Sequence, residues 1–285
     1  MAEVDDSLVA KVIPPRRRKS RKGENGSVMV IGGSYLYHGA PTLTALAAYR
    51  AGADLVYLSV PEVISVPIRA ISPALIVIPF SDTKLTMGVV RRIVKNVPRV
   101  DAVAIGPGLS IADTAPLLTL IKELLGRGMR LVLDASALIP QVLEIISSHN
   151  VVLTPHAGEF KRLFGVEPSD DMEERCGLVR DEAKKHGVTL LVKGAVDVIS
   201  DGDSTYINRR GSPSMTVGGT GDVLTGIVAT LLAKGLNSVE AAAAAVYVNC
   251  VAGEEVTERM GLHILPTDVI EELPNVMKRY DRIID

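Results

Sequence analysis

The chain has 285 residues, of which 47% are hydrophobic, and a formal net charge of -2. Because charges of both signs nearly cancel, nothing favours nucleic acid or an acidic membrane as a partner, and a small-molecule substrate fits better. The two cysteines, Cys176 and Cys250, lie far apart and form neither a disulfide framework nor a CxxC zinc motif. Without an apolar leader or an apolar run of roughly 20 residues, we expect a cytoplasmic protein that does not span a membrane.

The first 25 residues lack hydrophobic periodicity and include Pro14, Pro15 and a basic run over 16–22. They predict a basic N-terminal arm over 1–25, followed by one catalytic domain over 26–285. The arm is either a solvated charged tail or a segment whose Lys22 and Gly23 fold over a phosphate-bearing ligand, since clustered cations favour phosphate.

After the arm, short apolar runs alternate with segments of helical spacing. The alternation predicts an α/β fold with a mostly parallel sheet covered by helices on both faces. A turn signal, Asp201-Gly202-Asp203, separates two further runs and predicts a hairpin at an antiparallel edge. The predicted strands are 28–31, 55–60, 75–78, 102–105, 131–133, 151–153 and 190–192, with 196–200 and 204–208 in the hairpin. The predicted helices are 41–51, 87–96, 114–125, 172–186, 220–234 and 238–258.

Ligands of open parallel sheets bind beyond the carboxyl ends of the strands. The most telling segment there is the glycine-rich loop 217–226, which runs directly into the predicted helix 220–234. Glycines let backbone amides approach a phosphate, and the helix N-terminus adds free donors and a positive dipole end. The loop is neither a Walker A motif nor the dinucleotide fingerprint. It predicts an anion hole.

Four side chains near these strand ends are candidates for chemistry. Asp222 either caps the helix or acts as a general base during phosphoryl transfer, with its basicity lowered by the helix dipole. His156 either caps the next helix or contacts substrate. Glu159 either caps that helix or helps to hold Mg²⁺. Lys193 ends an apolar strand, where a solvated surface charge is unexpected.

Five motifs then occur in one order: Gly32-Gly33-Ser34 with Gly39-Ala40, Gly106-Pro107-Gly108, Thr154-Pro155-His156-Ala157-Gly158-Glu159, Lys193-Gly194 and Gly218-Gly219-Thr220-Gly221-Asp222. Together they resemble the ADP/ATP-dependent NAD(P)H-hydrate dehydratases, and the resemblance runs from about Lys22 to Asp268. It implies a ribokinase-like, three-layer α/β/α fold. It further implies that ADP or ATP, with Mg²⁺, phosphorylates the ring hydroxyl of the S epimer of NADHX or NADPHX, the hydrates of NADH and NADPH. Loss of phosphate then restores the cofactor.

The resemblance also implies residue roles, with Asp222 as the catalytic residue. Contacts to the hydrated dinucleotide are implied for Ala40, Gly108, His156 and Asp222. Contacts to the adenine nucleotide are implied for Lys193, Gly194, Ala195, Val196, Asp197, Gly218, Gly219, Thr220 and Gly221. The chain departs from the usual pattern at Ser136, where a second Asp is more common, and at Asn249, where His is common.

Many relatives carry an N-terminal epimerase domain, for which the predicted arm leaves no room, so we expect dependence on a separate epimerase. The resemblance also suggests ADP as the donor and a homo-oligomer such as a tetramer. The nearest alternative is a ribokinase-like kinase of a vitamin-precursor alcohol such as hydroxyethylthiazole or hydroxymethylpyrimidine, because the same anion hole and Asp would serve it. A nucleotide-binding protein without turnover is disfavoured by the intact glycine-rich loop.

Overall fold

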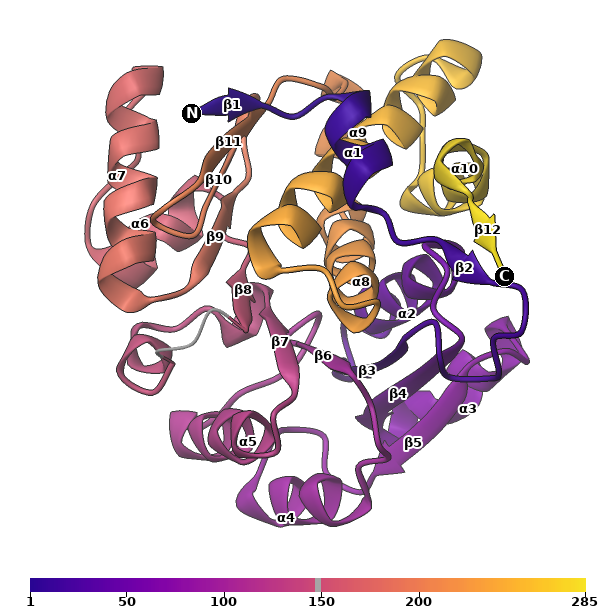
Figure 1. The fold of residues 1–285 in the computed structure, drawn as a ribbon. Coiled ribbons are helices and arrows are strands. Elements are labelled where there is room, and N and C mark those ends of the chain that lie inside the picture. Colours follow the sequence, from indigo (N-terminus) through magenta and orange to yellow (C-terminus); the bar gives the residue numbers. More distant parts are fainter. Residues whose placement is uncertain (147–149) are drawn as a thin grey trace.

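A twisted sheet of ten strands forms the centre of the computed structural model, which describes residues 1–146 and 150–285 (Figure 1). The strands are β1 (Ala2–Glu3), β3 (Ser27–Ile31), β4 (Leu55–Pro61), β5 (Ile76–Phe80), β6 (Ala102–Ile105), β7 (Arg130–Leu133), β8 (Val151–Leu153), β9 (Thr189–Val192), β10 (Asp197–Ser200) and β11 (Thr205–Asn208). Their order is β1-β11-β10-β9-β8-β7-β6-β3-β4-β5. All pairs from β9 to β5 are parallel, whereas β10 is antiparallel to both its neighbours.

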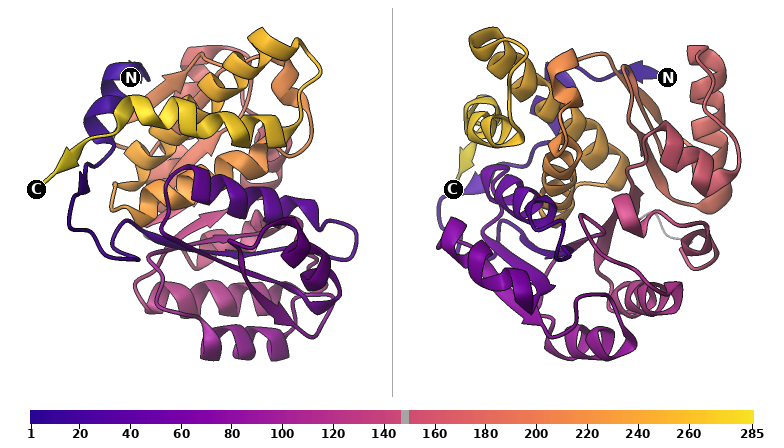
Figure 2. Two further views of the ribbon diagram at one scale, coloured as in Figure 1. Left: turned by 90° about the vertical axis from the view of Figure 1, so that its right-hand side faces the viewer. Right: turned by 180° about the vertical axis from the view of Figure 1, so that it is seen from behind.

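Helices cover both faces of this sheet (Figure 2). They are α1 (Asp6–Val12), α2 (Gly39–Arg50), α3 (Glu62–Ile71), α4 (Met87–Asn96), α5 (Thr114–Gly126), α6 (Ala157–Phe164), α7 (Met172–His186), α8 (Thr220–Ala233), α9 (Ser238–Met260) and α10 (Pro266–Met277). One face packs against α2, α8 and α9, and the other against α4, α5 and α7. No helix of the described residues is long and apolar enough to cross a membrane.

Strand β3 shows why the sheet is buried on both sides. Val28 and Val30 contribute to the core on the α8 face, and the alternating Met29 and Ile31 contribute to the core on the α5 face. This alternation of apolar residues on both faces is expected of a central parallel strand. On the α8 face the helices lie close together, because a Cβ at Gly226 would come within 2.2 Å of the Thr44 carbonyl oxygen.

The predicted α/β fold, with helices on both faces of a mostly parallel sheet and an antiparallel edge, is confirmed. The helices 87–96 and 172–186 are found with the predicted bounds, and the hairpin is formed by β10 and β11. Helix α6 was expected, without bounds, as the helix that follows His156. Helices α3 and α10 were not predicted, because each contains an internal proline, Pro67 and Pro274, that obscures the helical signal in the sequence.

Residues 1–25 are not a featureless arm, and that part of the prediction is wrong. Strand β1 pairs with β11, and α1 begins at its N-cap Asp5, whose carboxylate accepts a hydrogen bond from the Leu8 amide. Val4, Val9 and Ile13 are buried, and α1 packs against α9. Val9, Val12 and Ile13 have the three- and four-residue spacing of one helix face, but α1 spans only seven residues, which is too short for the pattern to stand out in the sequence. A single domain over the remaining residues stays a prediction.

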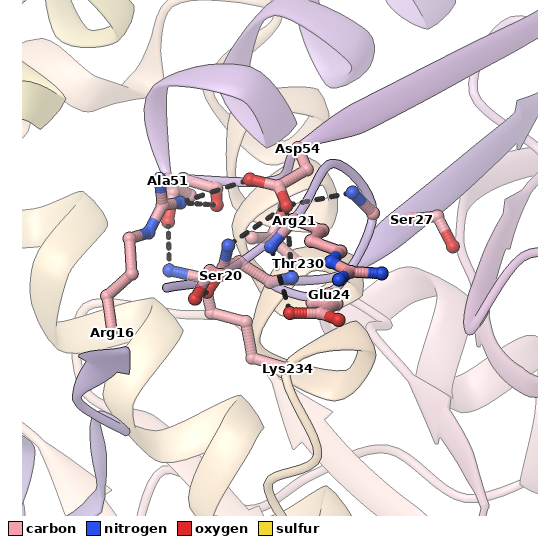
Figure 3. A network of polar contacts seen from close by, with 12 residues as sticks. Arg16, Ser20, Arg21, Glu24, Ser27, Ala51, Asp54, Thr230 and Lys234 are labelled. Atoms are coloured by element: carbon pink, nitrogen blue, oxygen red, sulfur yellow. Dashed lines mark hydrogen bonds and ion pairs between the residues drawn. The ribbon is translucent and has the colours of Figure 1, made fainter. Parts of the chain in front are cut away.

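The segment around Lys22 and Gly23 lies at the amino ends of the strands (Figure 3). The amides of Gly23 and Asn25 donate to the Asp54 carboxylate at 3.0 and 3.1 Å, and Asp54 directly precedes β4. The glycine-rich loop lies at the opposite, carboxyl edge of the sheet. Lys22 and Gly23 therefore lie away from that loop, and the alternative that they fold over a phosphate-bearing ligand stays a prediction.

Candidate active site

A cavity of about 520 Å³ opens at the carboxyl edge of the sheet, which is within the usual size of small-molecule sites. It lies between the start of α8, the β9–β10 turn, the short 3₁₀ helix η3 (Pro213–Thr216) and α9. Six of the residues predicted to contact the nucleotide line it: Lys193, Gly194, Ala195, Asp197, Thr220 and Gly221.

The glycine-rich loop ends in the N-cap of α8. Gly219 has φ 109°, and a Cβ there would come within 2.8 Å of Leu43 and 2.9 Å of Pro266, so only glycine fits. The Thr220 hydroxyl donates to the Met215 carbonyl at 2.7 Å and thereby holds the loop in place. A Cβ at Gly221 would lie 3.5 Å from the Lys193 ammonium. The N-terminal amides of α8 and the Lys193 ammonium group therefore face the same part of the cavity, which favours the binding of an anion there.

Lys193 belongs to a buried ionic network that joins three strand ends. Its Nζ lies 3.0 Å from Asp134 Oδ1 and 4.0 Å from Glu159 Oε2. Thr225 of α8 donates to Asp134 Oδ2 at 2.8 Å. Although burial opposes the charge, these two carboxylates raise the pKa of Lys193 above its ordinary value. Lys193 is therefore a fixed cation at neutral pH.

Asp222 stands in the first turn of α8 and faces this network. Burial and the nearby negative charge of Asp134 raise the pKa of Asp222 to about 7, and the Lys193 charge only partly opposes them. The expected lowering of its basicity by the helix dipole is thus outweighed by burial. A carboxylate that gains its proton near neutral pH is well matched to general base catalysis.

The capping alternatives for His156 and Glu159 are realised in a capping box at the start of α6. His156 Nδ1 accepts from the Gly158 and Glu159 amides at 3.0 and 3.3 Å, and Glu159 Oε2 accepts from the His156 amide at 2.9 Å. Because Nδ1 accepts, the imidazole proton is on Nε2. The His156 side chain is 60% exposed, and its Nε2 lies 3.5 Å from Glu159 Oε2. Substrate contact by His156 stays a prediction.

Ala40 and Gly108, both predicted to contact the dinucleotide, are brought together across two strand ends. A Cβ at Gly108, where φ is +65°, would lie 3.2 Å from the Ala40 Cβ and 2.6 Å from the Tyr37 carbonyl oxygen. Two loops therefore approach closely at this point. Their role in substrate binding remains a prediction, as does that of the other predicted site residues.

Asp197 shapes the β9–β10 turn. Its Oδ1 accepts from the Gly194 amide at 3.0 Å and its Oδ2 accepts from Asn208 Nδ2 at 2.9 Å. Burial nevertheless raises the pKa of Asp197 to about 6. Val196 packs against the core beneath the turn, while Gly218 precedes the N-cap of α8. Asp197 lines the cavity, whereas Val196 and Gly218 do not, and the nucleotide contacts predicted for them stay predictions.

Sequence reasoning missed the coupling of Asp134 and Thr225 to Lys193, and it gave no role to Asn249 and Cys250 in the cavity wall. The one available signal was the position of Asp134 directly after a buried strand. The close approach at Gly106, where a Cβ would lie 1.9 Å from the Asp134 carbonyl oxygen, holds this strand end in place.

Two solved structures show which fold this chain shares. A ribokinase-like superfamily protein from Enterococcus faecalis has a TM-score of 0.82 at 29% identity, with 99% of this chain and 96% of that chain covered. The ADP/ATP-dependent NAD(P)H-hydrate dehydratase from Bacillus subtilis, co-crystallised with ATP/Mg²⁺, has a TM-score of 0.84 at 26% identity, with 98% and 99% covered. The fold is ribokinase-like.

The sequence comparisons are more specific. The family model described as NAD(P)H-hydrate dehydratase matches residues 28–275. The ADP-dependent (S)-NAD(P)H-hydrate dehydratase of Nitrosopumilus maritimus is 53% identical over 279 residues, which cover 98% of this chain and 97% of that protein. The bifunctional NAD(P)H-hydrate repair enzyme Nnr of Pyrobaculum aerophilum is 46% identical over 93% of this chain and 53% of its own length. The chain belongs to the NAD(P)H-hydrate dehydratase family.

Proposed function

We propose that this protein is a carbon–oxygen lyase of metabolite repair, which dehydrates the S epimers of NADHX and NADPHX with ADP as the phosphoryl donor. The observation that carries the proposal is that the start of α8 and the Lys193 ammonium line one cavity, and that Asp222, in the first turn of α8, is close enough to Lys193 and Asp134 to feel both charges. The high identity to the dehydratase of Nitrosopumilus maritimus supports the choice of substrate and donor. ATP is the alternative donor.

Asp222 is the residue that moves a proton in this reaction. As the ring hydroxyl oxygen of the hydrate attacks the terminal phosphorus, the Asp222 carboxylate takes the hydroxyl proton, and the bridging P–O bond breaks to release a nucleotide shorter by one phosphate. The ring C–O bond then breaks, inorganic phosphate leaves and the adjacent carbon loses a proton. This restores the double bond.

Lys193 and the amides of the glycine-rich loop stabilise the charge of the phosphoryl group. Both are positioned before the nucleotide arrives, Lys193 by Asp134 and the loop by the Thr220 hydroxyl. Preorganised donors of this kind contribute most of the catalysis in phosphoryl transfer. The predicted contacts of Ala40, Gly108 and His156 would then hold the dinucleotide across the neighbouring strand ends.

Mg²⁺ is proposed to enter with the nucleotide. Within residues 1–146 and 150–285, no group of three or more His, Cys, Asp or Glu side chains is placed to hold a metal ion. This fits Mg²⁺, which commonly takes most ligands from substrate phosphates and water and only one or two from carboxylates. Glu159 would act through water, because its Oε2 already accepts from the His156 amide. The ion would neutralise phosphate charge.

A cytoplasmic location, a homo-oligomeric state such as a tetramer and a functional link to a separate NAD(P)H-hydrate epimerase complete the proposal. The oligomeric state and the link to an epimerase rest on the family resemblance, and the location rests on the two isolated cysteines. Light scattering of the purified protein tests the oligomeric state.

The function is tested by adding the protein to chemically hydrated NADH with ADP, with ATP and without nucleotide. The proposal predicts nucleotide-dependent return of the absorbance of reduced nicotinamide, with release of phosphate. A kinase of a vitamin-precursor alcohol would instead leave the hydrate unchanged and form a stable phosphate ester from hydroxyethylthiazole or hydroxymethylpyrimidine. No recovery of absorbance with either nucleotide would refute the dehydratase assignment.

A further inference from the structure

A second cavity, of about 310 Å³, opens at the amino edge of the sheet, where both ends of the chain meet. Strand β2 (Arg16–Arg17) pairs there with β12 (Ile283–Ile284), and residues of both strands line the cavity. Helix α8 separates it from the candidate active site, because Thr220 at the start of α8 lines one cavity and Lys234 at its C-cap lines the other. The 14 residues of α8 span about 21 Å, so the two cavities are distinct.

The charged side chains around this second cavity are mostly cationic. Among its described lining residues, the single carboxylate of Asp281 accompanies five cations, which are Arg16, Arg50, Lys234, Lys278 and Arg282. Five cations less one carboxylate leave an excess of four positive charges, whereas the whole chain has a net charge of -2. Like charges around one space repel each other, and an anion in that space relieves the repulsion.

Two of these cations, Arg16 and Lys234, lie close to each other. A Cβ at Gly52 would lie 2.7 Å from Lys234 Nζ and 4.0 Å from a terminal nitrogen of Arg16 (Figure 3). Lys234 donates to the Ala51 carbonyl, and Arg16 donates to the Gly52 carbonyl and pairs with Asp54. An ammonium group has three donors and a guanidinium five. The fold therefore anchors both cations and leaves donors on each of them for a ligand.

Arg50 and Lys278 bring two further positive charges, and neither pairs with a carboxylate among the described residues. Arg50 stands in the last turn of α2, and Lys278 is the C-cap of α10. Both side chains are exposed, so they can adjust their position to a ligand. The cations of this cavity thus come from α2, α8, α10 and the two ends of the chain, and they surround one space.

We propose that this cavity is a second anion site, which binds a diphosphate or triphosphate group through four of its cations, Arg16, Arg50, Lys234 and Lys278. Phosphate oxygens accept several charge-assisted hydrogen bonds at once, and the excess of positive charge matches the several negative charges of such a group. The ligand contacts both ends of the chain, so its binding also stabilises the fold. The site is separate from the proposed function and does not depend on it.

The test is calorimetry of the full chain, saturated with ADP, with inorganic triphosphate as the probe. The wild type is expected to bind one triphosphate per chain. The double variant Arg50→Gln with Lys278→Gln is expected to bind it roughly tenfold or more weakly, because it loses two charged donors. The matched control is Arg91→Gln with Lys95→Gln, which removes two exposed cations from α4 on the other face of the sheet. Its dissociation constant should stay within roughly twofold of the wild type.

The same titrations distinguish an inorganic ligand from a nucleotide. If the site takes the diphosphate group of a nucleotide, ADP blocks triphosphate, and ADP alone binds at two sites per chain in the wild type and at one in the Arg50 and Lys278 variant. Both results support the anion site. A wild type that binds neither triphosphate nor a second ADP overturns it, as does equal weakening in the Arg91 and Lys95 control.

Melting temperatures show that the Arg50 and Lys278 variant is folded. Without ligand it is expected to melt like the wild type, because both side chains are exposed. Triphosphate should raise the melting temperature of the wild type and of the Arg91 and Lys95 control more than that of the Arg50 and Lys278 variant. Equal rises in all three proteins would contradict the proposed site. Dehydration of NADHX is not part of either readout, so a failure of the proposed function leaves this test valid.

Discussion

Helix α8 carries a half-buried charge near each end, and the two ends differ in how that charge is satisfied. At the carboxyl edge of the sheet, burial raises the pKa of Asp222 to about 7. At the amino edge, burial and the nearby Arg16 lower the pKa of Lys234 to about 8. Lys234 donates to the Ala51 carbonyl at 3.2 Å, and Arg16 donates to the Gly52 carbonyl and pairs with Asp54 (Figure 3).

The comparison separates structure from function. The cations at the amino edge bind carbonyl groups at the end of α2, where the helix dipole favours positive charge, so the fold itself uses them. The carboxylate at the carboxyl edge lies near a cation and at the end of the glycine-rich loop, where a ligand phosphate fits. Each prediction below therefore changes a residue at the carboxyl edge or at the amino edge of the sheet.

The largest effect is expected from Asp222→Asn. The change removes the proposed proton acceptor but keeps the size of the side chain, so the rate of a single turnover should fall by roughly a thousandfold. Binding of ADP should remain. A near-normal rate in a variant that binds ADP would contradict the assigned role.

Stability supplies a control for this variant. A carboxyl group whose pKa is raised from 3.8 to about 7 by folding destabilises the native protein as pH rises through that interval. The free energy of unfolding of the wild type should therefore contain a fall between pH 4 and 7 that Asp222→Asn lacks. This difference would show that the variant is folded and that Asp222 is the group that titrates.

Lys193→Met is expected to be the most destabilising single change. It leaves Asp134, at 3% exposure, as a buried charge without its cation, which costs roughly 3 kcal/mol in such pairs. Urea unfolding measures the loss. The double variant with Asp134→Asn should regain part of it, whereas additive losses would show that the two groups are not coupled.

The sequence predicts the central strands well because each is a short apolar run buried on both faces, as in β3. It also predicts the loop before α8, since Gly219 must adopt a positive φ. It cannot predict that Asp134 and Lys193, 59 residues apart, form an ion pair. The pKa of Asp222 was misjudged for the same reason, because burial by distant segments outweighs the local helix dipole.

At the amino edge, Lys234→Met should change stability without changing chemistry. The pKa of Lys234 is lowered from 10.5 to about 8 by folding, so wild-type stability should gain about 1.4 kcal/mol per pH unit as the pH rises through that window. The variant should lack this gain and keep its turnover within roughly twofold at pH 7. A large loss of turnover would mean that the two ends of α8 are not functionally separate.

The smallest effect is expected at the capping box. His156→Ala removes the acceptor for two amides and should cost about 1 kcal/mol of stability, measured by urea unfolding. His156→Asn keeps a good N-cap and should unfold like the wild type. If His156 also contacts the dinucleotide, both variants should show a raised KM for the hydrate. An unchanged KM for the hydrate in His156→Asn would show that His156 acts only as the N-cap of α6.

The pH dependence of the single-turnover rate, at saturating nucleotide, tests the role of the buried Asp222 carboxylate most directly. The account predicts a tenfold fall in rate per pH unit below a break near pH 7. It further predicts that Asp134→Asn moves this break to lower pH, because the charge of Asp134 helps to raise the pKa of Asp222. A rate that is flat between pH 5 and 8, or a break at the same pH in both proteins, would contradict the claim that Asp222 is the base.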